Sequence, residues 1–177
     1  DIEPNREWLQ VILNSLRTSE ALVALLHPRF NESRWTDQEV GYVLGRSRPV
    51  LSVRLGLDPY GFFGMNQGLP GIGKEPGMLA VDIVNVLLSD SRTCDAVKDT
   101  LVRKLEHSTG WNTSNNLVAI LRQQSPLTQD QYLRLRAAQK SNIEVGNAFD
   151  VGPYLDSLAR HYSNPGQASS VLDDEPF

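Results

Sequence analysis

The sequence predicts an α/β fold in which a small parallel sheet is followed by a helical C-terminal part. Two apolar runs with strand character, residues 21–26 and 49–55, flank a segment with helical character at 36–45. A strand, a helix and a second strand in so short a stretch form a βαβ unit, whose strands are parallel. Beyond residue 77 the strand pattern stops. Because two strands alone do not make a stable sheet, we expect part of the sheet to precede Asp1.

The first element expected along the chain is a helix that Asn5 can cap. Its apolar residues Trp8, Ile12 and Leu16 recur every four positions, which places them on one helical face. Residues 21–26 then form an uninterrupted apolar run. Such a run is typical of a strand that is buried on both faces, as in a parallel sheet.

The helix expected at 36–45 begins with a sequence that has a structural interpretation. Thr36 at the N-cap and Glu39 three residues later form a capping box, and Trp35 and Val40 occupy the positions of a hydrophobic staple. Residues 127–132 repeat the arrangement at another helix start. On this local pattern alone, Glu39 is a capping residue.

Residues 56–77 are rich in glycine and proline and predict a loop. The remainder favours helices over residues 78–89, 92–108, 114–123, 128–140 and 153–162. We therefore divide the chain into an α/β part over residues 1–77, a helical part over 78–163, and a small, polar tail over 164–177 that we expect to be disordered.

Composition excludes several classes of function. The 17 basic and 21 acidic residues give a net charge of −4, which argues against a nucleic-acid partner. No apolar run approaches the ~20 residues needed to cross a bilayer, so no membrane partner is expected. The single cysteine, Cys94, cannot form an internal disulfide, and the histidines (His27, His107 and His161) are not at metal-ligand spacing. We expect a cytoplasmic protein without a bound metal.

Residues 68–74 spell most of a phosphate-binding loop, G-x-x-x-x-G-K. The next position, which should be Ser or Thr to hold Mg²⁺, is Glu75, and Pro76 and Gly77 follow directly. We expect that no helix begins there to direct its amides at a phosphate. Turn formation accounts for these residues better than phosphate binding does.

A longer pattern surrounds Glu39. The spacing S-x-W-x-x-x-E over residues 33–39 follows a strand and precedes G-x-x-x-G-x-x-x-P-V over residues 41–50. This combination resembles the Toll/interleukin-1 receptor (TIR) domain, with residues 1–60 in register. Residues 57–62 and the helical half look like bacterial TIR proteins of antiviral defence, including the Thoeris-type group. The family's first strands are missing from this sequence.

The resemblance implies a flavodoxin-like fold and cleavage of NAD⁺ at its nicotinamide–ribose bond, by hydrolysis or cyclisation. By position, Glu39 matches the family's catalytic glutamate, and Ser33 and Trp35 match substrate-binding positions. NAD⁺ is then a substrate, and no cofactor is implied. Implied partners are other TIR surfaces, through self-association, and a downstream effector protein.

The chemistry of that reaction needs only one carboxylate. Nicotinamide leaves as a neutral molecule and requires no acid, whereas the oxocarbenium-like transition state is stabilised by a nearby negative charge. The alternative function is a non-catalytic TIR module that signals by TIR–TIR assembly, with Glu39 merely capping its helix. Because half of the family's pocket is missing, we expect residues 1–177 alone to be inactive and to expose an unpaired apolar strand edge.

Overall fold

The computed structural model describes residues 4–33, 35–64, 67–124 and 126–163. The chain divides into two compact units, residues 1–97 and 98–177. The sequence placed this division at residue 77, before the third helix, whereas the structure includes that helix in the first unit. The tail over residues 164–177, for which disorder was predicted, lies outside the described residues.

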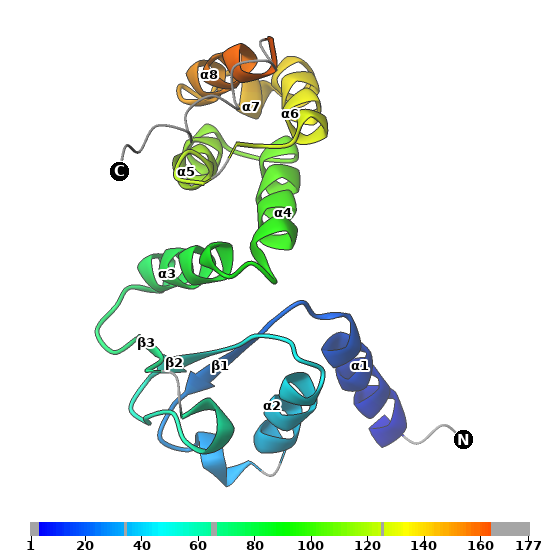
Figure 1. The fold of residues 1–177 in the computed structure, drawn as a ribbon, viewed down its shortest axis with the longest axis vertical. Coiled ribbons are helices and arrows are strands. Elements are labelled where there is room, and N and C mark those ends of the chain that lie inside the picture. The colour runs from blue at the N-terminus through cyan, green and yellow to red at the C-terminus, as the bar shows by residue number, and fades with distance from the viewer. Residues whose placement is uncertain (1–3, 34, 65–66, 125, 164–177) are drawn as a thin grey trace, which may run out of the picture. The chain divides into compact units, whose positions relative to one another are not determined.

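A three-stranded parallel sheet forms the centre of the first unit (Figure 1). Its strands, in the order in which they lie side by side, are β1 (Leu22–Leu26), β2 (Val50–Arg54) and β3 (Leu69–Pro70). The predicted α/β class and the parallel pair are confirmed. The sequence did not predict β3, because a strand of two residues is too short to show a period.

One face of this sheet carries the hydrophobic core of the unit. Helix α2 (Thr36–Gly45) connects β1 to β2 and contacts both strands, while helix α1 (Pro4–Thr18) contacts α2. The core cluster consists of Ala24, Leu26, Phe30 and Val40. Helix α1 begins at Pro4, so Asn5 is a residue of the helix rather than its cap, contrary to the sequence prediction.

The opposite face of β1 is not buried. Val23 is 37% exposed and Leu25 is 46% exposed, although the unbroken apolar run predicted burial on both faces. Helix α3 (Pro76–Ser89) lies beside β2 and β3 on that face. The apolar run correctly predicted a strand, but it did not predict that only one face of that strand is buried.

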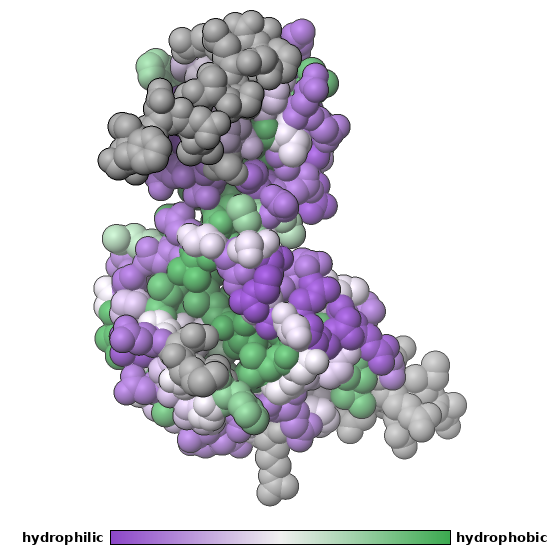
Figure 2. All heavy atoms as spheres, in the orientation of Figure 1, coloured by the Kyte–Doolittle hydropathy of each residue, from purple (hydrophilic) through white to green (hydrophobic). Residues whose placement is uncertain are grey.

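Helix α3 is itself unusually apolar. Only Leu88 of this helix is fully buried, while Met78, Val81 and Val86 are exposed. Figure 2 shows apolar residues gathered on this side of the first unit, over α3 and the strands beside it. Within the described residues, no helix is both long and apolar enough to cross a membrane.

The second unit is helical. Its helices are α4 (Cys94–Glu106), which begins in the first unit, α5 (Trp111–Leu121), α6 (Gln129–Ser141), α7 (Ile143–Gly146) and α8 (Val151–Ser163). The predicted helices are confirmed, and the four-residue α7 was not predicted. The capping box that Thr128 and Gln131 predicted is present, with the Gln131 amide donating to the Thr128 hydroxyl at 3.2 Å.

A charged cluster joins two of these helices. Arg134 of α6 donates to both carboxylate oxygens of Glu106, at 2.7 and 2.8 Å, and to Asp99 at 2.9 Å. These bonds hold the pKa of the Asp99 carboxyl below its usual value. The side-chain amide of Asn142 also donates to the backbone carbonyls of Glu106 and Ser108, which adds to the contact between the end of α4 and the end of α6.

Candidate functional site

The segment that enters α2 folds back at the carboxyl end of β1, where ligand sites gather in parallel sheets. Phe30 anchors it in the core, and the Arg29 amide donates to Nδ1 of His27 at 3.1 Å. That bond gives His27 a structural role in the turn. The amides of Leu55 and Leu57 both donate to the Leu26 carbonyl, so the end of β2 is held against the same point.

Thr36 does not cap α2, contrary to the sequence prediction. Its hydroxyl donates to the carbonyl oxygens of Phe30 and Ser33, at 3.0 Å each, and no side chain caps the helix. Trp35 already has helical backbone angles, and its carbonyl accepts the Glu39 amide at 2.9 Å. The first turn therefore includes Trp35, and the geometry that a capping box requires is lost.

Trp35 and Glu39 lie one turn apart and therefore share a helical face. Trp35 is 46% exposed and meets Trp8 of α1 edge to face, with ring centroids 5.9 Å apart and planes at 87°. Val40, the other member of the predicted staple, belongs to the core cluster. The Trp35 ring contributes to a contact between α1 and α2.

The three predicted site residues occupy one short segment. The Ser33 hydroxyl accepts the Trp35 amide at 3.3 Å, which fixes the turn before the helix. Glu39 is half-buried, and its carboxylate has no hydrogen bond or ion pair with the residues that the structure describes. Within the described part of the chain, no side chain is therefore held in place by the Glu39 carboxylate.

A second polar pair near α2 was not predicted from the sequence. The Tyr60 hydroxyl, in the loop after β2, donates to Asp37 at 2.7 Å. Burial of the hydroxyl, followed by its bond to Asp37, raises the pKa of Tyr60 to about 12, so the phenol remains a donor at neutral pH. The pair borders a hollow of about 300 Å³ between α2 and Phe62, whose ring is 84% exposed. The sequence drew attention to this loop only through residues 57–62, which resemble the bacterial TIR proteins of antiviral defence.

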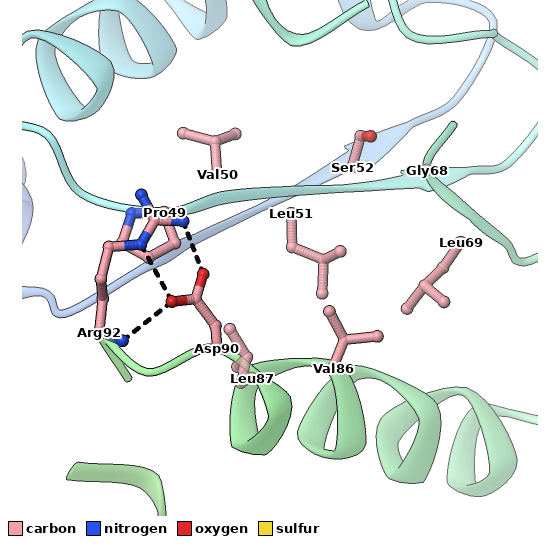
Figure 3. A pocket seen from close by; sticks show the side chains of 10 residues that line it. All are labelled: Pro49, Val50, Leu51, Ser52, Gly68, Leu69, Val86, Leu87, Asp90 and Arg92. Carbon is pink, nitrogen blue, oxygen red and sulfur yellow. Dashed lines mark hydrogen bonds and ion pairs between the residues drawn. The ribbon is translucent and has the colours of Figure 1, made fainter. Parts of the chain in front are cut away.

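Another hollow, of about 390 Å³, lies between the sheet and α3 (Figure 3). Leu51 and Leu69 point toward Val86 of α3, whereas Val50 and Ser52 point to the other face of the sheet. At one end Asp90 accepts from the Arg92 guanidinium at 2.6 and 3.0 Å. These bonds lower the pKa of Asp90. The hollow therefore presents apolar side chains and one carboxylate that is already paired with an arginine.

The phosphate-loop pattern at 68–74 does not form a phosphate loop. Strand β3 occupies Leu69–Pro70 inside the motif, and Lys74 pairs with Asp82. Helix α3 does begin at Pro76, contrary to the prediction, because proline is well tolerated in the first helical turn. At Gly71 a side chain would meet Leu55 at 2.6 Å, which explains the glycine by packing.

Across the described ranges, no group of three or more His, Cys, Asp and Glu side chains could hold a metal ion. Cys94 is a free thiol at the start of α4. No family model, curated protein or solved structure matches this chain.

Proposed function

We propose that the α/β part of this chain belongs to a flavodoxin-like TIR domain and that Glu39 is the catalytic glutamate of an NAD⁺ nucleosidase. The reaction cleaves the nicotinamide–ribose bond, by hydrolysis or by cyclisation. In this proposal, Trp35 and Ser33 help to bind the substrate. The released product acts in bacterial defence signalling through a downstream effector.

The observation that carries the proposal is the carboxylate of Glu39, which has no hydrogen-bond or ion-pair partner among the described residues. The structural alternative assigned Glu39 to a capping box, and the Thr36 hydroxyl is instead bonded to two carbonyl oxygens. Glu39 is half-buried in the first turn of a helix that follows the carboxyl end of β1. A charge in that position, free of protein partners in the described residues, is available to a ligand.

The residues suit a reaction in which positive charge develops on a ribose. As nicotinamide departs, the ribose carbon and ring oxygen share an oxocarbenium charge, which an adjacent carboxylate stabilises more than it stabilises the substrate. The half-exposed ring of Trp35, one turn away, offers an apolar surface for stacking. Water enters for hydrolysis, or a second atom of the nucleotide attacks for cyclisation.

The decisive substitution is Glu39→Gln, made in the complete gene product that contains these 177 residues. We expect nicotinamide release to fall by about 100-fold or more, because the amide keeps the shape of the side chain but removes the charge. The free energy of unfolding should change by less than about 0.5 kcal/mol, since no described partner is lost. Nicotinamide release is measured by chromatography, and stability by thermal melting.

Glu32→Gln is the matched control. It makes the same chemical change seven residues earlier, at an exposed side chain whose only ion-pair partner among the described residues is Arg29, at 3.3 Å. It should leave turnover within twofold. Wild-type turnover by Glu39→Gln would refute the catalytic role, and a parallel loss of activity and melting temperature would assign Glu39 to the fold.

The second candidate function is assembly through TIR surfaces, which the exposed side of β1 favours. Val23 and Leu25 are exposed apolar residues on an edge strand of the described sheet, and such strands pair readily with other chains. We expect residues 1–177 to elute as an oligomer, and Val23→Lys to shift the protein toward monomer. Val11→Lys, at an exposed position of α1, is the control and should not do so. A monomeric wild-type chain would contradict assembly through β1.

A further inference from the structure

The hollow between the sheet and α3 is bordered by a part of β2 that no strand covers (Figure 3). Strand β3 has only two residues, and they pair with Val53 and Arg54 at the end of β2. The four residues at 49–52 precede that pairing, and all of them line the hollow. At about 3.3 Å for each residue, this stretch of strand edge is about 10 Å long.

The backbone of β2 bonds alternately to its two sides, because successive residues of a strand direct their N–H and C=O groups in opposite directions. The Leu22 amide donates to the Pro49 carbonyl at 3.0 Å, and the Leu55 amide donates to the Leu26 carbonyl at 2.9 Å. The odd-numbered residues of β2 therefore bond to β1.

The even-numbered residues of β2 face the opposite side, where β3 and the hollow lie. The Arg54 carbonyl accepts the Gly71 amide there, at 2.9 Å. By the same alternation, Val50 and Ser52 direct their backbone groups toward the hollow.

Three of those groups have no bond. Among the residues that the structure describes, none bonds to the Val50 N–H, the Val50 carbonyl or the Ser52 N–H. Ser52 is only 2% exposed, so its N–H is also shielded from water, and its side-chain hydroxyl has no partner either. Buried N–H groups are paired in nearly all native structures, because an unpaired one costs free energy. The edge of β2 therefore lacks a backbone partner.

The rest of the lining limits what that partner can be. Leu51, Leu69 and Val86 point into the hollow and make it apolar (Figure 3). The charged side chains that line it, Asp90 and Arg92, are bonded to each other. A charged side chain entering the hollow would lose its hydration without gaining an uncommitted counter-ion, so the side chains that enter are uncharged.

We propose that the hollow binds an extended peptide segment of a partner protein, which adds to the edge of β2 as a further strand. The segment bonds to the free groups of Val50 and Ser52, and every second side chain points toward Val86. Those side chains are apolar and preferably β-branched. The proposal does not depend on the activity proposed for Glu39.

The size of the site favours a short segment over a second copy of this chain. An edge of about 10 Å pairs with three or four residues. A stable interface between two folded proteins takes about 20–30 residues from each side, so this site suits a flexible segment that is inserted alone.

The probe is a pentapeptide of alternating threonine and valine, acetylated and amidated at its ends, which is titrated into residues 1–177. Backbone bonds do not depend on side-chain identity, so this peptide should bind saturably below millimolar concentration. Amide hydrogen exchange, followed by NMR, should slow by about tenfold or more at Val50 and Ser52. The Leu51 amide, which already bonds to β1, should exchange at an unchanged rate.

Two matched controls separate strand addition from unspecific attraction. The same peptide, N-methylated at alternate residues, keeps its side chains but loses donors, and it should bind at least tenfold more weakly. Val86→Lys places a charge in the hollow and should weaken binding of the unmodified peptide at least tenfold. Val81→Lys makes the same change at a residue of α3 that is similarly exposed (42%, against 38% for Val86) but does not line the hollow, and it should have less than a twofold effect.

The other outcomes overturn the proposal. Absence of binding at millimolar peptide refutes it, and equal binding of the N-methylated peptide reduces the hollow to an apolar pocket. Equal weakening by both lysine variants indicates unspecific attraction, and protection confined to Val23 and Leu25 places the peptide on the edge of β1. Protection of Val50 and Ser52 that rises with protein concentration, without any peptide, assigns the hollow to a second copy of the chain.

Discussion

The contact between Trp35 and Trp8 allows a quantitative test of how α1 is held on α2. A buried tryptophan covers about 150–250 Å², and Trp35 retains 46% exposure. Roughly half of that area, at about 25 cal/mol per Å², gives about 2–3 kcal/mol for Trp35→Ala. This is below the ~3–5 kcal/mol typical of a fully buried aromatic residue. The edge-to-face geometry at 5.9 Å should contribute about 1 kcal/mol of the loss.

A double-mutant cycle measures that shared part. Trp35→Ala and Trp8→Ala are made singly and together, and the free energy of unfolding of the first unit is followed by hydrogen exchange of the Leu55 amide, which bonds across the strands at 2.9 Å. We expect a coupling energy of about 1 kcal/mol. Trp35→Phe should recover most of the stability, because it keeps an aromatic ring beside Trp8.

The control cycle pairs Trp35→Ala with Val86→Ala. Val86 lines the hollow beneath the opposite face of the sheet (Figure 3), so the two effects should add. A coupling near zero between Trp8 and Trp35 would show that the ring contact does not hold α1 in place. A Trp35→Ala protein of unchanged stability that loses NAD⁺ binding would instead assign this ring to the ligand.

Two further predictions follow from individual bonds. Thr128→Ala should lower the free energy of unfolding of the second unit by about 1 kcal/mol in urea, and Thr128→Asn should keep most of that stability because asparagine also caps a helix. At Thr36, asparagine should be no more stable than alanine, because the Thr36 hydroxyl donates to carbonyls instead of accepting an amide. Arg134 holds the pKa of Asp99 below 3.8, so the stabilisation is complete above that pH and is lost as the pH falls through the lower folded value. The melting temperature of the second unit should therefore fall as the pH is lowered below about 4, and less steeply in Arg134→Leu, in which the bond is already missing.

Much of the architecture was predictable because it depends on short-range patterns. The period of the apolar residues gave β1, β2 and the longer helices, and the capping box at Thr128 gave the start of α6. The same rules failed at Thr36, where the residues match but Trp35 is already helical and the hydroxyl is drawn to the loop carbonyls. A capping pattern indicates which hydrogen bonds can form at a helix start. Which of them do form depends on the conformation of the loop that enters the helix.

The candidate site divides in the same way. The sequence by itself determined that Trp35 and Glu39 share a helical face, because a spacing of four residues is one helical turn. Only the tertiary structure decided that Trp35 meets Trp8, that Asp37 meets Tyr60, and that Glu39 has no partner among the described residues. Those contacts join segments more than twenty residues apart, and their formation depends on how whole elements pack, which a local pattern does not encode.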